Sequence, residues 1–361
     1  MKRYRNLYPE IASFINLWHA FNSAAKGKRI KDQVVRFEFH VEERLLELEH
    51  QLRAKTYRPG AYRSFFIRDP KLRLISAAPF RDRVVHHALY RVVEPIFERT
   101  FIGDSYANRL GKGTHAALDR AQQFARRYRY VLQCDVREFF PSIDHRIMRG
   151  ILARKLADDD VLWLCDRIID GGAGVLDGQY TQVFFPGDDL LAAARPRGLP
   201  IGNLTSQFWA NVYLNELDQF IKRELRCGAY LRYVDDWLLF ADDKATLWSW
   251  KEATRERLAG LRLSLHEASS TVYPVGNGIG FLGFRLYPDH RRLRRRNGVM
   301  FQRRLRRVVR VRRRGECGMG PIWDCVRGWE SHANHGDTAA LQAAMLAQQT
   351  APAAAPSVPR R

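Results

Sequence analysis

Apolar and polar residues follow two different repeat patterns along the chain, and these predict helices and strands in turn. Apolar positions recur at helical spacing through most of residues 1–57 and again at 81–101. Residues 62–78 contain short alternating runs interrupted by Asp69-Pro70, which predicts a β-hairpin. An apolar run at 128–140 predicts a buried strand that ends in polar residues. The first part of the chain is therefore expected to combine helices with short strands.

The same patterns predict further elements along the rest of the chain. They are a helix at 141–156 with Ser142 as its N-cap, a loop opening into a long helix at 198–225, a hairpin at 230–242, a helix at 244–261 and a strand within 279–288. From Thr338 onwards the chain is rich in Ala, Gln and Pro and contains no Asp or Glu. This composition predicts a frayed helix or a disordered, flexible tail at 338–361.

The charge of the chain indicates a polyanionic partner. Sixty Lys and Arg residues against 39 Asp and Glu give a net charge of +21, and 13 arginines without an acid lie between Arg291 and Arg314. A charge run is usually a solvated face, but a block this dense repels itself unless a polyanion neutralises it. No apolar run approaches the roughly 18 residues of a membrane span. The start of the chain has no apolar secretory segment, so nucleic acid is the expected partner and a membrane is not.

The cysteines fit reduced thiols in a cytoplasm. There are five, scattered along the chain without a C-x-x-C pair. Cys317, Cys325, His332 and His335 lack the close cysteine pair of a zinc knuckle, so no zinc site is expected among them.

Three carboxylates are the candidate catalytic groups. Asp135 ends the run VLQCD, and Asp235 and Asp236 lie in the middle of the apolar hairpin LRYVDDWLLF. An isolated Asp-Asp pair is most often a solvated turn. If these strands are neighbours, however, the three carboxylates meet at one sheet edge and need bound cations. Oxygen ligands suit Mg²⁺, and two such ions roughly 3.5–4 Å apart clamp both oxygens of a phosphoryl displacement.

Several further motifs, in order along the chain, resemble those of reverse transcriptases. Tyr233-Val234-Asp235-Asp236 resembles the Y-x-D-D box, and 134–144 resembles the first carboxylate motif. Residues 199–214 resemble the helix motif, and residues 281–284 resemble the primer-grip strand. Residues 70–89 resemble the fingers motif, and residues 328–338 resemble a thumb segment. The fingers and thumb segments are similar to those of group II intron and retron enzymes.

The resemblance implies an α+β right-hand polymerase of fingers, palm and thumb. The expected parts are N-terminal helices and fingers at 1–111, palm at 112–148 and 201–288, an insertion at 149–200, a basic thumb at 289–337 and the tail at 338–361. The implied activity is RNA-directed DNA synthesis with two Mg²⁺ ions, for which Mn²⁺ is an alternative. A primer, a template RNA, dNTPs and a cDNA–RNA hybrid are the implied partners.

Site roles are carried over to matching residues. Asp135 and Asp235 are the expected metal ligands, supported by Asp236 and by the carbonyl of Val136. Expected dNTP contacts are Lys71, Arg73, Arg63, Phe140, Ile201, Gly202 and Gln207, with Phe140 as the ring that excludes a 2′-hydroxyl. The primer grip is expected at Phe281, Leu282 and Gly283, and nucleic-acid contacts at Arg303, Arg304, Arg306, Arg307 and Arg310. For the arginines the alternative is a solvated basic face. For Phe140 the alternative is an ordinary core position.

The helix motif indicates a subtype. Ile201-Gly202 and Ser206-Gln207 replace the usual Q-G and S-P pairs, and I-G-x-x-x-S-Q resembles the enzymes of diversity-generating retroelements. That resemblance implies error-prone copying at template adenines and a small basic accessory protein, in a bacterial or phage-encoded system. A retron, intron-derived or defence-associated reverse transcriptase is the first alternative. A non-catalytic nucleic-acid-binding protein on the same scaffold is the second.

Overall fold

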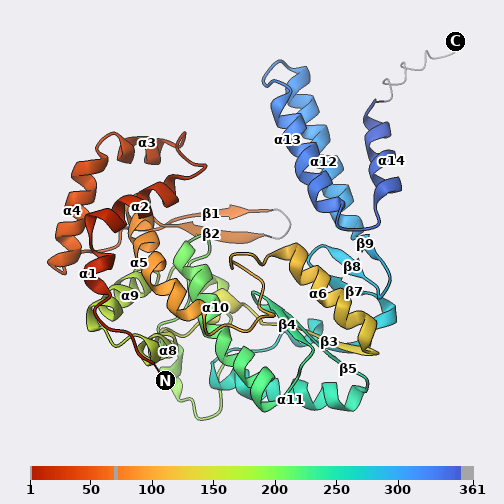
Figure 1. Cartoon of the computed structure of the whole chain (residues 1–361), viewed down its shortest axis with the longest axis horizontal. Helices are drawn as coiled ribbons and strands as arrows, with labels where there is room; N and C mark the ends of the chain where they lie inside the picture. Colours follow the sequence, from red (N-terminus) through yellow and green to blue (C-terminus); the bar gives the residue numbers. More distant parts are fainter. Residues whose placement is uncertain (1, 69–71, 351–361) are drawn as a thin grey trace. The chain divides into compact units, whose positions relative to one another are not determined.

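The computed structural model describes residues 2–68 and 72–350, with side chains up to residue 345 (Figure 1). It contains two compact units. The first comprises residues up to Gly113, Leu132–Leu239 and Ala245–Val272. The second comprises Thr114–Val131, Phe240–Lys244 and the chain from Tyr273 onwards.

The N-terminal region of the first unit is helical, as predicted. Its helices are α1 (Tyr8–Ile11), α2 (Phe14–Ala25), α3 (Asp32–Glu38), α4 (Val41–Arg53) and α5 (Phe80–Glu98). Ser13 caps α2 by accepting a hydrogen bond from the amide of Asn16. Leu17, Phe21 and Ala24 repeat at three- and four-residue intervals and are buried where α2 packs along α5. The helical period of the sequence therefore reports a real packed face.

The predicted fingers hairpin is also present. β1 (Arg63–Ile67) pairs antiparallel with β2 (Arg73–Ala77), so that Arg63 lies opposite Ala77 and Ile67 opposite Arg73. Residues 69–71 are outside the described part of the chain.

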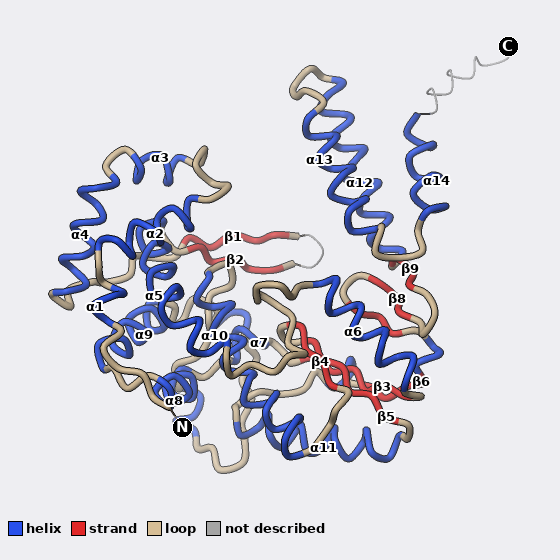
Figure 2. The backbone as a smooth tube through the Cα atoms, viewed as in Figure 1, coloured by secondary structure: helices blue, strands red, loops and turns tan. Residues whose placement is uncertain are grey.

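A four-stranded sheet carries the candidate catalytic segments (Figure 2). Its strands are β3 (Tyr130–Asp135), β4 (Tyr230–Tyr233), β5 (Asp236–Ala241) and β6 (Thr271–Pro274), in the order β4-β5-β3-β6. The strand predicted at 128–140 ends earlier, at Asp135, because Glu138 adopts a positive φ of 46° and the chain turns into the short helix α7 (Phe139–Ser142). Asp135 is thus the last strand residue before that turn.

The remaining helices of the first unit include those predicted at 141–156, 198–225 and 244–261, with one correction at the start of the first of them. They are α8 (His145–Lys155), α9 (Asp159–Gly171), α10 (Leu204–Gln219), continued by a π-helical turn at Phe220–Glu224, and α11 (Lys244–Gly260). The predicted cap at Ser142 is wrong. Asp144 caps α8 by accepting from the amide of Ile147, whereas the Ser142 hydroxyl donates to the carbonyl of Glu138.

The second unit combines helices with a three-stranded sheet. Its elements are α6 (Thr114–Arg127), β7 (Ile279–Phe281), β8 (Phe284–Leu286), β9 (Arg291–Leu293), α12 (Arg295–Arg313), α13 (Gly320–Ala333) and α14 (Ala339–Thr350). The sheet has the order β7-β8-β9, and α6 packs against β8.

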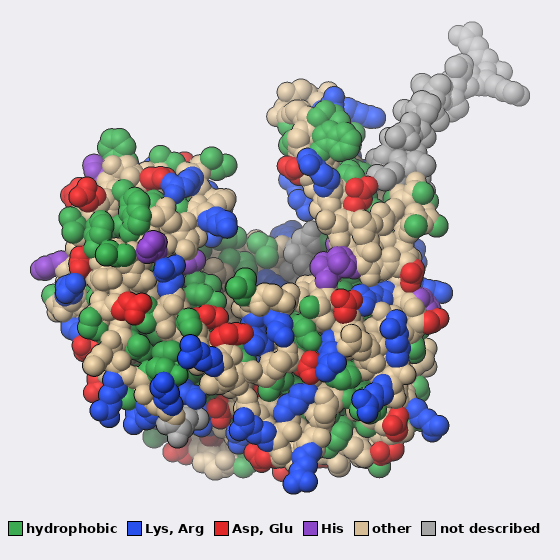
Figure 3. Space-filling view, in the orientation of Figure 1, with side chains coloured by type: hydrophobic (Ala, Val, Ile, Leu, Met, Phe, Trp, Pro, Cys, Tyr) green, Lys and Arg blue, Asp and Glu red, His purple; other side chains and the backbone are tan. Residues whose placement is uncertain are grey.

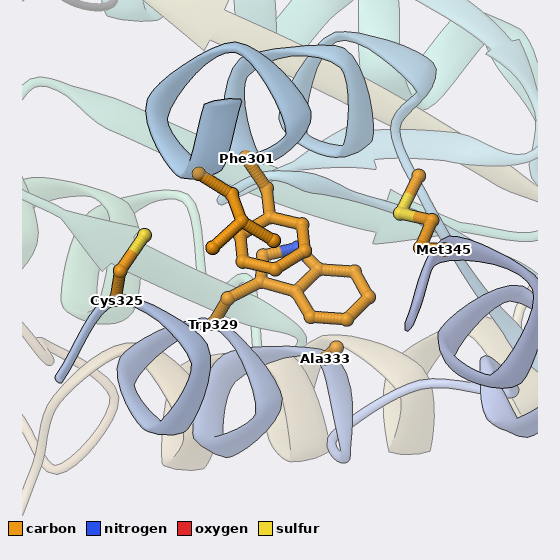
Figure 4. Packing of buried hydrophobic residues seen from close by; sticks show 6 residues of the cluster. Phe301, Cys325, Trp329, Ala333 and Met345 are labelled. Carbon is orange, nitrogen blue, oxygen red and sulfur yellow. The ribbon is translucent and has the colours of Figure 1, made fainter. Parts of the chain in front are cut away.

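The three C-terminal helices share a small core (Figure 4). Phe301 of α12 stacks on Trp329 of α13 with ring centroids 4.1 Å apart. Met345 of α14 belongs to the same buried cluster. The segment predicted as a frayed helix or a flexible tail therefore begins with a helix. The sequence analysis did not single out Met345 as a buried residue, because the residues around it are mostly Ala and Gln.

Lys and Arg side chains are spread over the face drawn in Figure 3, with acidic side chains between them. Within the described part of the chain, none of the helices combines the length and apolar character that a bilayer crossing requires.

Candidate active site

A tight hairpin presents one candidate catalytic carboxylate. In the pairing of β4 with β5, Tyr233 lies opposite Asp236, which leaves Val234 and Asp235 as a two-residue loop. Val234 has a φ of 56°. Positive φ at the first loop residue is usual for glycine and strained for a β-branched residue. Asp235 is therefore presented by a turn that the surrounding structure must hold in place.

Asp135 and Asp235 come together, as the sequence predicts. The pKa of Asp235 is raised from 3.8 to about 6, first because the carboxyl is buried and second because the negative charge of Asp135 is close by. The positive charges of Arg73 and Arg232 act in the opposite direction. Two carboxylates whose joint ionisation is unfavourable fit a site for divalent cations.

The end of β3 is held by a neighbouring segment. The carbonyl of Asp135 accepts from the amide of His266 at 2.8 Å, and the amide of Arg137 donates to the carbonyl of Ser264 at 2.8 Å. Val136 forms an antiparallel bridge with Leu265 between these two bonds. In such a pair the carbonyl of Val136 points away from the partner strand, which leaves it available as the predicted neutral ligand.

The predicted cluster of three carboxylates is reduced to a pair. Among the described residues, no three His, Cys, Asp or Glu side chains are grouped so that they would hold a metal ion. Asp235 occupies the loop, whereas Asp236 begins β5 opposite Tyr233. A carboxylate pair with a backbone carbonyl still fits Mg²⁺, which takes one or two protein carboxylates together with substrate phosphates.

The predicted cations Arg73 and Arg63 lie at opposite ends of the fingers hairpin. Arg73 is exposed and close enough to Asp235 to lower its pKa. Arg63 lies four residue pairs away, at the other end of the hairpin, so the two arginines are not neighbours. Lys71 lies outside the described residues. Of the three predicted cations, Arg73 is therefore the one that is described near Asp235.

Phe139 and Phe140 have different environments. Phe139 is a core residue with 2% of its surface exposed, whereas Phe140 is half-buried and 5.3 Å from it between ring centroids. The partly exposed ring is the one that the sequence predicts to contact the nucleotide sugar.

The start of the helix motif is docked on the fingers hairpin. The carbonyl of Ile201 accepts from the amide of Ser76 at 2.8 Å. Gly202 has a φ of 114°, and a Cβ there would lie 2.9 Å from a methyl group of Ile75. Gln207 is exposed one turn along α10.

Sequence reasoning missed Asn203, the buried residue that secures this contact. Its side-chain oxygen accepts from the amide of Ala78 at 3.1 Å, and its nitrogen donates to the carbonyls of Ser76 and Pro200 at 2.9 and 3.0 Å. Asn203 precedes the first residue of α10, and Asn at that position is read as an ordinary cap. Its side chain instead makes no cap hydrogen bond to the helix and bonds the hairpin.

The predicted primer-contact residues lie in the second unit. Leu282 and Gly283 form the turn between β7 and β8, both with positive φ, and Phe281 is buried. On α12 the five predicted contact arginines are all exposed, and within the described residues none is paired with a carboxylate. They are Arg303, Arg304, Arg306, Arg307 and Arg310.

Comparison with known proteins identifies the family. Residues 67–286 match the model of the family described as reverse transcriptase (RNA-dependent DNA polymerase). The chain belongs to the reverse transcriptase family. The matched region contains the β4–β5 hairpin, the carboxylate pair and the helix motif described above.

Curated relatives agree with this assignment. The protein YkfC of Escherichia coli (strain K12) is 27% identical over 279 residues, which cover 66% of this chain and 70% of YkfC. The group II intron-encoded protein LtrA of Lactococcus lactis subsp. cremoris is 27% identical over 221 residues, 60% of this chain and 34% of LtrA. This chain therefore aligns with about a third of LtrA. A structure of apo telomerase from Candida tropicalis, truncated from the C-terminal domain, is 12% identical with a TM-score of 0.46, covering 64% of this chain and 55% of that chain.

The raised pKa of Asp235 predicts how this reverse transcriptase responds to pH. If Asp235 binds Mg²⁺, the rate of primer extension at limiting Mg²⁺ should fall as the pH drops through about 6, because protonation of Asp235 would compete with cation binding. Since protons and cations compete, raising Mg²⁺ should move the midpoint to lower pH. Rates measured across the pH range at two Mg²⁺ concentrations check this, and a midpoint that ignores Mg²⁺ would contradict it.

Proposed function

We propose that this reverse transcriptase copies a template RNA into cDNA by metal-assisted nucleotidyl transfer. The observation that carries the proposal is the approach of Asp135 to Asp235 at the ends of separate segments of one sheet. Two carboxylates this close repel each other, and bound cations would relieve that repulsion. The pair lies within the region that matches the family.

Each residue near the pair has a role in the proposal. Asp135, Asp235 and the carbonyl of Val136 hold the cations, and Asp236 supports the second carboxylate. When bound, divalent ions lower the pKa of the primer 3′-hydroxyl and neutralise the leaving pyrophosphate. Arg73 binds the triphosphate, to which its planar guanidinium is suited. Phe140 lies under the sugar and leaves no room for a 2′-hydroxyl.

The finer proposal is a diversity-generating retroelement enzyme. It rests on Ile201, Gly202 and Gln207 at the start of α10. Ile201 supplies packing where a glutamine would supply polar discrimination, and polar discrimination is what gives large selectivity. The proposal includes a small basic accessory protein as partner.

A group II intron-type enzyme is the second candidate, supported by the similarity to LtrA. The two candidates differ in the errors that they predict. A retroelement enzyme should misincorporate mainly opposite template adenines, whereas an intron-type enzyme should copy adenines as accurately as other bases.

Primer extension on a defined RNA, followed by sequencing of the cDNA, tests both levels of the proposal. Wild-type protein should make cDNA and Asp135→Asn should not, and equal yields would reject the polymerase function. Errors concentrated at adenines, and reduced in Ile201→Gln, support the retroelement type. Errors spread evenly over the four bases would reject that type and leave the polymerase function standing.

The exposed arginines of α12 predict a measurable salt dependence. Arg306→Gln combined with Arg310→Gln removes two charges one helical turn apart. If each contacts a phosphate, the slope of log affinity against log salt should become shallower by about 0.7–0.9 per contact. Arg327→Gln on α13 is the control, because that exposed arginine already faces Asp324. Equal slopes for the wild type and the double variant would show that α12 does not contact phosphates.

A further inference from the structure

Arg232 is a buried charge three residues before Asp235. Neither Arg232 nor its partner Asp218 on α10 has any exposed side-chain surface. The arginine Nε and Nη2 donate to the two carboxylate oxygens of Asp218 at 2.8 and 2.7 Å. The Tyr230 hydroxyl donates to the same carboxylate at 2.6 Å. The charge of Arg232 is therefore fully paired inside the unit.

The rest of the guanidinium serves the catalytic turn. Nη1 donates to the side-chain oxygen of Asn211 at 3.1 Å and to the carbonyl of Val234 at 2.8 Å. Val234 is the loop residue with positive φ, immediately before Asp235. A β-branched residue persists in that conformation only where the surroundings determine it. The bond from Arg232 is a contact of this kind.

The backbone of Arg232 is fixed as well. Its amide donates to the carbonyl of Asp104, and its carbonyl accepts from the amide of Tyr106, both at 2.9 Å. Asn211 donates to the carbonyl of Ala107 at 2.8 Å. The loop at 104–107, helix α10 and strand β4 therefore meet at Arg232. The remaining side-chain bond of Arg232 goes to the turn at Val234.

We propose that Arg232 is a positioning residue, which holds the Val234 carbonyl so that the strained turn presents Asp235 to the substrate. This inference rests on the proposed catalytic role of Asp235. Arg232 itself contacts neither nucleotide nor primer in the proposal. A residue of this kind acts on the chemical step, because small displacements of a catalytic group are costly to the rate.

A matched pair of variants separates positioning from general core stability. Arg232→Met removes the bond to Val234, whereas Tyr230→Phe removes a bond to Asp218 in the same buried network and leaves the turn untouched. Arg232→Met should lower kcat about 100-fold, with KM for dNTP within about threefold of wild type. Tyr230→Phe should keep kcat within about threefold. A kcat for Arg232→Met no lower than that of Tyr230→Phe would overturn the proposal.

Val234→Gly provides the second test. Glycine adopts a φ of 56° without strain, so the turn should depend less on Arg232 in that background. The loss caused by Arg232→Met should therefore be about tenfold smaller when residue 234 is glycine. An equal loss in both backgrounds would contradict the positioning role. Should Arg232→Met not fold, Arg232→Lys takes its place in the same cycle, because lysine keeps the charge but not the planar fork.

A readout without turnover completes the experiment. The Mg²⁺ concentration that gives half of the maximal rise in Tm should increase in Arg232→Met and not in Tyr230→Phe, because a displaced Asp235 binds cations less well. No difference between the two variants would count against the proposal. If Asp235→Asn is as active as wild type, the proposed function fails. If Asp235→Asn is inactive while Arg232→Met matches wild type, only the positioning role fails.

Discussion

Asp235→Asn is expected to reduce cDNA synthesis by at least about a thousandfold, since it removes several kcal/mol of transition-state stabilisation. Asparagine has nearly the same shape but no negative charge, so it tests the charge rather than the packing. The measurement is single-nucleotide extension of a primer on RNA under saturating dNTP and Mg²⁺. Asp236→Asn should lose less, because Asp236 begins β5 and lies outside the loop.

Thermal unfolding distinguishes this loss from misfolding. The folded pKa of Asp235 is about 6 against an ordinary value of 3.8, so above pH 6 the folded protein holds a charge that its surroundings disfavour. This penalty is relieved as the pH falls from about 6 towards 3.8, or when a cation binds. Without divalent ions at neutral pH, Asp235→Asn should therefore melt higher than wild type. Asp324→Asn, at an exposed pair on α13, should change neither activity nor Tm. A lower Tm for Asp235→Asn would argue against a cation site.

Phe140→Ala is expected to admit ribonucleotides. If the half-buried ring lies against the sugar, as proposed, its removal opens space there. The preference for dNTP over NTP should then fall roughly 100-fold, the scale on which a pocket distinguishes an added hydroxyl. The preference should fall mainly because the variant uses NTP better, and not because it uses dNTP less well. Competition between dCTP and CTP opposite one template base measures it.

Phe139→Leu is the matched control. Phe139 is the adjacent ring, 5.3 Å away and almost fully buried, so a smaller residue there should lower Tm and leave sugar selection unchanged. A change in selection at Phe139 equal to that at Phe140 would show that the ring acts through packing and not as a gate.

The features that the sequence predicted correctly are local or strongly patterned. The helical stripe of α2, the β1–β2 hairpin and the apolar strand ending at Asp135 each show in the spacing of their own residues. The approach of Asp135 to Asp235 followed from the order of motifs in a known type of chain, since periodicity alone does not determine which strands are neighbours.

The features that it missed depend on contacts between distant residues. Asn203 bonds a hairpin more than 120 positions away, and nothing beside it in the sequence separates that role from capping. Met345 is buried only because α12 and α13 offer it a cluster. Arg63 and Arg73 lie on the two strands of one hairpin, but the antiparallel register places Arg63 at the opposite end of the hairpin from Arg73.

Helix α12 has a consequence for handling the enzyme. Its arginines repel one another along 19 residues, and the helix carries no acidic residue. Only a narrow apolar strip, with Phe301 and Leu305 buried, packs the helix against its neighbours. Dissolved salt shields that self-repulsion over distances of about 10 Å at 0.1 M, yet the same ions would weaken the proposed contacts of the helix with phosphates. The two responses have opposite signs. Synthesis should therefore peak at an intermediate ionic strength, and preparations made in dilute buffer should retain host nucleic acid as a substitute counterion.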